Sequence, residues 1–207
     1  SGRVWPTSTF RPDIQGIRAL AVLLVVIYHA GGPLTGGFVG VDVFFVLSGF
    51  LVTNLLLRDL GRDGTVRFGR FYSRRMRRLL PAALVTLIGA AFVFTVIASP
   101  IEAFDARGAM RAAALWFSNW YFIGEASDYF ATDVAASPVL HFWSLSIEEQ
   151  FYLLWPLALA GLFRLCRRAG DHQGTVLRSI VAVLALASLA AAGWIGRTDV
   201  TRAYYGT

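Results

Sequence analysis

Two side chains that could do chemistry lie within one apolar stretch near the start of the chain. Arg18 and His29 are eleven residues apart. That spacing is about three helical turns, so both side chains fall on one helix face, roughly 16 Å apart along the axis. A cation and an imidazole are costly in a membrane-length segment and mark a functional site by default. A histidine can act as a general base near neutral pH. This helix face could therefore hold a long ligand, with the cation of Arg18 at one end and the base His29 at the other.

Both residues also have a purely structural interpretation. Arg18 lies one turn into the expected helix and could extend its charged end to the membrane interface. A buried His29 could simply bind a backbone carbonyl. Spacing alone leaves these interpretations open.

A second group of candidate residues is cationic. Four arginines fall within five positions, at Arg74, Arg75, Arg77 and Arg78. Cytoplasmic anchoring by the positive-inside rule explains them adequately. Arg75 and Arg78 are additionally neighbours on one helical face. Such a pair can bind a phosphate or pyrophosphate through forked, charge-assisted hydrogen bonds.

A third group lies in residues 141–150. His141, Ser144 and Glu148 are spaced so that they share one face of a helix. Glu148 and Glu149 place two adjacent carboxylates near the start of an apolar helix. Favourable interaction with the helix dipole does not require both of them. One of them could therefore polarise a histidine or an acceptor hydroxyl. A further carboxylate, Asp42, lies early in an apolar stretch, where it could pair with an arginine.

The elements that must position these residues are membrane helices. The 207-residue chain is 56% hydrophobic, with a mean hydropathy of +0.58, which is too apolar for a soluble domain. We expect an all-α, polytopic integral membrane helical bundle. Its full spans are predicted near residues 14–30, 38–57, 79–98, 144–163 and 179–195.

The arginine-rich stretches determine the expected topology. Residues 58–78 contain eight Arg and two Asp, and a second cluster covers 164–178. Both clusters are expected to be cytoplasmic, as is the N-terminus. A full crossing at 109–123 would put the second cluster outside, so this short segment is predicted to be a partial or re-entrant helix. Residues 99–108 are expected to form a loop, and Pro81 to fall in the first turn of its span.

Composition also excludes several functional classes. All 19 basic residues are arginines, which cluster between apolar spans, so a nucleic-acid partner is not expected. The single cysteine, Cys166, allows no internal disulfide, and no metal-ligand spacing is visible. The Arg- and Ala-rich, Lys-free composition suggests a bacterial source.

Five stretches of the chain resemble the acyltransferase-3 family of bacterial multi-span membrane O-acyltransferases. They are residues 10–29, 37–51, 71–82, 119–122 and 140–152, in family order. The resemblance implies transfer of an acyl group from acyl-CoA, with acetyl-CoA the favoured donor, to a hydroxyl of a cell-envelope glycan or glycolipid. It also implies a location in the bacterial plasma membrane.

The resemblance assigns roles to Arg18, His29, Arg75, Arg78, Ser144 and Glu148, and the residue patterns add the other candidates. His29 is expected to be the base or acyl relay, and Glu148 the second catalytic residue. The expected substrate-binding residues are Arg18, Asp42, Ser144 and Glu149. The expected acyl-CoA-binding residues are Arg74, Arg75, Arg77 and Arg78. No metal is expected.

The chain supplies fewer spans than the family's membrane domain. It is therefore expected to be the N-terminal portion of a larger protein, whose further spans, and in longer members an extracytoplasmic domain, complete it. Two other functions stay open. One is a non-catalytic lipid or acyl-group transporter subunit, in which Arg18, His29 and Glu148 form a proton relay. The other is a structural membrane scaffold.

Overall fold

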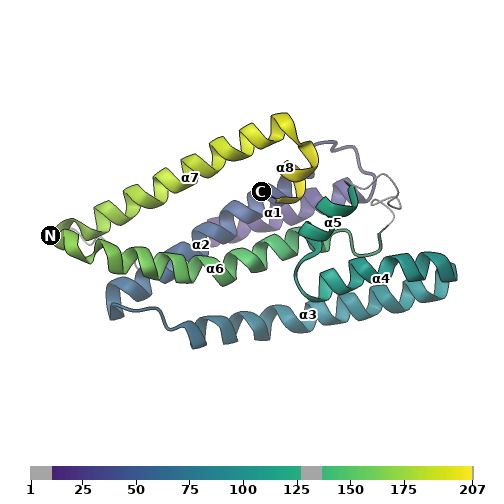
Figure 1. Cartoon of the computed structure of the whole chain (residues 1–207), viewed down its shortest axis with the longest axis horizontal. Helices are drawn as coiled ribbons and strands as arrows, with labels where there is room; N and C mark the ends of the chain where they lie inside the picture. Colours follow the sequence, from purple (N-terminus) through teal and green to yellow (C-terminus); the bar gives the residue numbers. More distant parts are fainter. Residues whose placement is uncertain (1–10, 127–136, 207) are drawn as a thin grey trace. The chain divides into compact units, whose positions relative to one another are not determined.

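The computed structural model describes residues 11–126 and 137–206, so Phe10, the first residue of the first family-like stretch, lies outside it. Every regular element in these two ranges is helical (Figure 1). The elements are α1 (Pro12–His29), α2 (Val39–Asp63), α3 (Phe68–Ile97), α4 (Pro100–Ala114), α5 (Ser118–Ala126), α6 (Phe142–Cys166), the 3-10 helix η2 (Arg167–His172), α7 (Gln173–Thr198) and α8 (Val200–Gly206). The expectation of an all-helical fold is confirmed for this part of the chain.

Within the described ranges, four helices are long and apolar enough to cross a membrane. They are Pro12–His29, Val39–Asp63, Phe68–Ile97 and Ala169–Thr198. In the most apolar window of Phe68–Ile97, 0% of the residues are buried, as expected for a surface that faces lipid. The span predicted at 144–163 lies within α6, which is not among these four, and it stays a prediction.

The structure corrects three local expectations. Pro81 lies inside α3, not in its first turn, because the helix already begins at Phe68. Residues 99–108 are not a loop, since Ser99 and Glu102 form a capping box that starts α4 at Pro100. The segment 109–123 is not one helix. It is divided between α4 and α5, and Trp116 at the break has a φ of 59°, a left-handed conformation that few non-glycine residues adopt.

The chain forms two compact units, of which the first is Ser1–Val66 with Trp155–Leu177. Here α1 and α2 pack side by side (Figure 1). Gly37 and Gly40 allow this approach, because a Cβ atom at either position would collide with α1 backbone, at the carbonyls of Leu24 and Ala21. The indole of Trp155 on α6 donates to Thr53 Oγ1 on α2 at 2.8 Å.

The second unit is Arg67–Leu154 with Arg178–Thr207. In it α4 packs against both α3 and α5, and α5 packs against α8. Phe122 on α5 is 1% exposed and contacts the ring of Tyr205 on α8. The Tyr72 hydroxyl on α3 donates to the carbonyl of Leu153 on α6 at 2.9 Å. This hydrogen bond attaches α3 to the N-terminal half of α6, where the candidate carboxylates lie.

Candidate active site

One uninterrupted helix, α1, carries both Arg18 and His29. Its continuity means that the predicted relationship holds, with the two side chains on one face and roughly 16 Å apart along the axis. His29 is the last residue of α1 and is exposed. The imidazole is therefore accessible at the end of the helix opposite to Arg18.

The hydrogen bond of His29 determines which ring nitrogen can act as a base. Nδ1 lies 2.8 Å from the carbonyl oxygen of Val25, one turn earlier in α1. A carbonyl only accepts, so Nδ1 carries the hydrogen and donates it. In the neutral ring the lone pair is then on Nε2. The ring of Tyr28 stands edge-on to the imidazole, with centroids 5.2 Å apart.

Arg18 contacts an aromatic ring on the neighbouring helix. Its guanidinium carbon lies 4.9 Å from the ring centroid of Phe44 on α2, within the range of a cation–π interaction. Its Nε is buried and has no hydrogen-bond partner among the described residues. Asp42, exposed in the first turn of α2, is not ion-paired with any described arginine. Neither charge is therefore neutralised in this part of the chain.

In the second unit, three side chains form a connected group. The guanidinium carbon of Arg75 lies over the ring of Tyr152, 3.1 Å from its centroid. The Tyr152 hydroxyl donates to the carboxylate of Glu148, one turn earlier in α6. Tyr152 is 3% exposed, so the phenol joins the cation to the carboxylate away from solvent. We call Arg75, Tyr152 and Glu148 the arginine–tyrosine–glutamate cluster.

Glu149 lies beside this cluster, where its charge interacts with those of Arg75 and Glu148. Its Oε1 is buried without a hydrogen-bond partner among the described residues, and the same is true of the Nε of Arg75. Buried polar atoms are nearly always hydrogen-bonded in a complete native protein. One donor atom and one acceptor atom in this region are thus left available for a ligand.

The remaining predicted residues lie on the same two helices. Arg74, Arg77 and Arg78 are exposed on α3, so Arg75 is the half-buried member of the four. Ser144 lies one turn before Glu148 in α6, and its hydroxyl donates to the carbonyl of His141 at 3.1 Å.

Sequence reasoning missed the group that holds this part of α6. The amide nitrogen of Gln150 donates to the carbonyl of Trp116 at 2.8 Å and to Asn119 Oδ1 at 2.9 Å, while its oxygen accepts from the Trp120 indole at 3.2 Å. Ser146 Oγ accepts from the backbone N–H at the start of α5, Ser118. These bonds fix α6 on both sides of Glu148. The family-like stretch 119–122 was the available signal.

The structure thus brings Arg75, Glu148 and Glu149 together in one unit, with Ser144 one turn away. Arg18, His29 and Asp42 lie on the α1–α2 pair of the other unit. Within residues 11–126 and 137–206, no three His, Cys, Asp or Glu side chains are grouped so that they could hold a metal ion. Cys166 is free and buried.

Comparisons with known proteins show the family to which the chain belongs. Residues 11–198 match the family model described as an acyltransferase domain. The chain is 39% identical over 202 residues to the peptidoglycan O-acetyltransferase OatA of Listeria monocytogenes, covering 95% of this chain and 31% of that protein. It is 39% identical over 200 residues to the putative peptidoglycan O-acetyltransferase YrhL of Bacillus subtilis (95% and 30%). It is 38% identical over 199 residues to the O-acetyltransferase OatA of Staphylococcus aureus (96% and 32%). The chain therefore spans about a third of the length of these relatives. No solved structure matches it.

Proposed function

Since the chain belongs to the acyltransferase family, we propose that it is part of a membrane O-acyltransferase that moves an acetyl group from acyl-CoA to a hydroxyl of a cell-envelope glycan. The names of the relatives support both the acetyl group and the glycan acceptor. Four helices with the length and composition of membrane spans support a multi-pass location in the bacterial plasma membrane.

The observation that carries this proposal is the hydrogen bond from His29 Nδ1 to the Val25 carbonyl. It leaves Nε2 as the basic nitrogen at the exposed end of α1. In the proposed step, Nε2 takes the proton of the acceptor hydroxyl, and the hydroxyl oxygen attacks the thioester carbonyl carbon. The new C–O bond forms, the C–S bond breaks, and the proton passes to the CoA sulfur. A route in which Nε2 first accepts the acyl group uses the same nitrogen.

At the donor end, we assign the phosphates of CoA to the arginines of α3. Arg75 and Arg78 lie one turn apart on one face, and Arg74 and Arg77 add positive charge beside them. We place this end in the cytoplasm, with the N-terminus, on the basis of the arginine-rich residues 58–78. On α1, in the other unit, Arg18 is proposed to bind substrate and His29 to act at the thioester.

The carboxylates are proposed to serve the acceptor. Glu148 is proposed to orient the acceptor, with Ser144 and Glu149 of the same unit as substrate-binding residues. Asp42, in the other unit, is proposed as a further substrate-binding residue. The arginine–tyrosine–glutamate cluster supports a fixed orientation for Glu148, because its carboxylate already accepts from Tyr152. Further spans of the longer protein, and an extracytoplasmic domain, would complete the acceptor site.

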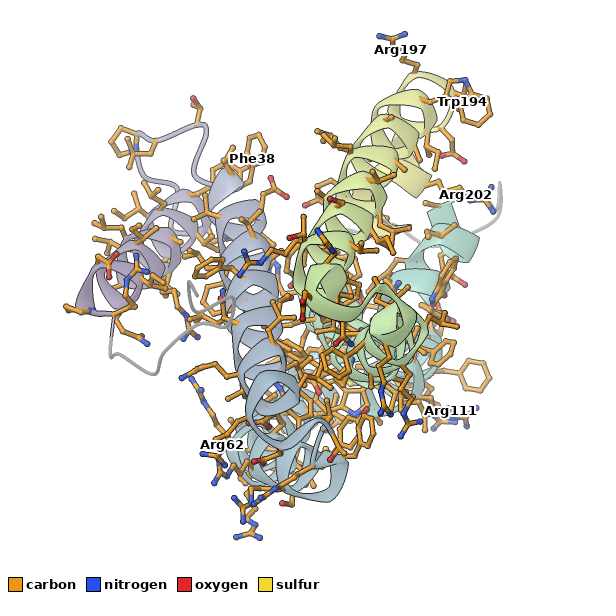
Figure 2. All side chains as sticks on the ribbon, turned by 90° about the vertical axis from the view of Figure 1, so that its left-hand side faces the viewer. Phe38, Arg62, Arg111, Trp194, Arg197 and Arg202 are labelled. Carbon is orange, nitrogen blue, oxygen red and sulfur yellow. The ribbon has the colours of Figure 1, made fainter. Side chains whose placement is uncertain are left out.

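The donor assignment can be tested with the purified intact protein, acetyl-CoA and a cell-wall glycan acceptor. Arg75→Ala/Arg78→Ala should raise the KM for acetyl-CoA at least roughly tenfold, the effect of losing one charge-assisted contact. Arg62→Ala is the matched control, because Arg62 belongs to the same arginine-rich stretch but pairs with Asp63 and points away from α2 (Figure 2).

If the wild-type protein neither binds nor cleaves acetyl-CoA, the donor assignment is wrong. Transport of an acyl group or lipid that depends on the proton gradient would then favour the Arg18, His29 and Glu148 proton relay instead.

A further inference from the structure

A pocket of about 300 Å³ lies between α3 and α4, away from all the residues assigned above. Its walls are mainly apolar, with Ala91 and Phe94 from α3 and Met110 from α4 among them. Two cations, Arg107 and Arg111, also line it. Since they are four residues apart on α4, both side chains belong to the same helix face.

Neither arginine is neutralised by the described part of the chain. The Arg107 guanidinium lies 5.1 Å from the ring centroid of Phe104, and no ion pair joins Arg107 or Arg111 to any described carboxylate. Of the two nearest acidic residues in sequence, Glu102 accepts from the backbone N–H of Ser99 in the capping box, and Asp105 forms no ion pair with a described arginine. The pocket therefore combines an apolar wall with two uncompensated positive charges.

The fold of α4 does not need these two charges. The helix is started by the Ser99–Glu102 capping box. A different part of its surface is covered, with Ala109 and Ala113 only 3% and 2% exposed and Gly108 against the ring of Tyr121 on α5. Arg107 and Arg111 are both exposed. A ligand, rather than packing, is the better explanation for two arginines at this position.

The location of the pocket restricts the class of ligand. It opens along the C-terminal half of α3, whose apolar window is not buried within the chain. Unpaired cations beside the apolar surface of a candidate membrane span are expensive unless an anion reaches them. An anionic phospholipid has a negatively charged phosphate at the membrane surface and acyl chains below it. This arrangement matches two cations beside an apolar wall.

We propose that this pocket binds one anionic phospholipid, with its phosphate between Arg107 and Arg111 and part of an acyl chain against Ala91, Phe94 and Met110. The site is separate from the proposed transfer chemistry, and its presence does not depend on that function. It would attach the α3–α4 pair to the lipid that surrounds it.

The test is native mass spectrometry of the intact protein in detergent, with added phosphatidylglycerol or phosphatidylcholine. We expect one phosphatidylglycerol to be retained and phosphatidylcholine to be retained much less. Arg107→Gln/Arg111→Gln should weaken retention of phosphatidylglycerol at least roughly tenfold, as for a lost hydrogen bond to a charged group. Ala91→Leu, which fills the apolar wall while keeping both charges, should weaken it as well.

The control variant is Arg197→Gln/Arg202→Gln, which removes two exposed arginines from α7 and α8; Arg197 points away from the end of α7 (Figure 2). The proposal is overturned if this control loses as much phosphatidylglycerol as the α4 variant, or if the α4 variant binds like wild type. It is also overturned if inorganic phosphate displaces the lipid at equal concentration, because the apolar wall would then contribute nothing. Unchanged elution and unfolding temperature without lipid exclude misfolding of each variant.

Discussion

The guanidinium of Arg75 lies over the ring of Tyr152, 3.1 Å from its centroid. The same phenol donates its hydroxyl hydrogen to Glu148. One buried tyrosine thus contacts a residue proposed to bind the donor and a residue proposed to orient the acceptor. The ring of Tyr152 contacts Arg75 and its hydroxyl contacts Glu148. If Arg75 binds the donor and Glu148 orients the acceptor, removing the ring and removing the hydroxyl should change different kinetic constants.

Tyr152→Phe keeps the ring under Arg75 and removes only the hydrogen bond to Glu148. We expect kcat for CoA release to fall roughly tenfold, as for the loss of a hydrogen bond to a charged group, with little change in the KM for acetyl-CoA. Tyr152→Leu also removes the ring and should raise that KM. Steady-state CoA release measures both constants. Equal loss of activity in the two variants, with KM unchanged in both, would contradict separate roles.

The close packing of α1 against α2 predicts an effect at Gly40. Gly40→Ala would push a Cβ atom into the Ala21 carbonyl and Val25, so the helices must separate. We expect a loss of about 1–3 kcal/mol in the free energy of unfolding, as for other overpacked sites, and lower activity because α1 carries His29. Gly16→Ala is the control, since nothing lies within 4 Å of its new Cβ. Thermal unfolding in detergent compares the two. Equal midpoints would show that the helices are not in close contact.

Gln150 is predicted to maintain the break between α4 and α5. Gln150→Leu would remove the donor to the Trp116 carbonyl and to Asn119, which is 1% exposed. Leaving such buried acceptors unpaired costs roughly 1–3 kcal/mol. Amide hydrogen exchange over residues 115–119 should therefore accelerate. Leu153→Ala, at an exposed position of the same helix, should leave it unchanged. Exchange that is equally slow in both variants would contradict this role.

The start of α4 should depend on pH through Glu102. The backbone N–H of Ser99 donates to this carboxylate at 2.7 Å and lowers the pKa of Glu102 below its ordinary value. A lowered folded-state pKa means that the stabilisation is complete above the unfolded-state pKa and is lost as pH falls through the folded-state pKa. Glu102→Ala should therefore speed amide exchange in the first turn of α4 at pH 7. The difference from wild type should vanish in acid. Asp105→Ala, on the same helix but outside the capping box, should show no such pattern.

The helical class and the shared face of Arg18 and His29 follow from the sequence alone, because a long apolar stretch has one stable conformation in lipid. The start of α4 could also have been found, since Ser99, Pro100 and Glu102 form a recognisable capping signal. The break at Trp116 could not. It depends on hydrogen bonds from Gln150, 34 residues away, and no local preference favours a left-handed tryptophan.

The tyrosine between Arg75 and Glu148 was missed for a similar reason. A Tyr in an apolar helix is ordinarily read as packing, and its role depends on a contact with α3 that spacing along α6 does not reveal. Spacing in the sequence singled out Arg75 and Arg78 among the four arginines of α3 but did not separate these two from each other. Only the packing against α6 distinguishes the half-buried Arg75 from the exposed Arg74, Arg77 and Arg78.

The most direct test of the central claim is single-turnover cleavage of acetyl-CoA by His29→Asn beside wild type. The asparagine amide can keep the hydrogen bond to the Val25 carbonyl but supplies no equivalent of Nε2. With acetyl-CoA binding and unfolding temperature unchanged, we expect the rate to fall by roughly 10²–10⁴, the usual contribution of a general base. A His29→Asn protein that transfers the acetyl group at the wild-type rate would contradict the role of His29 as the base.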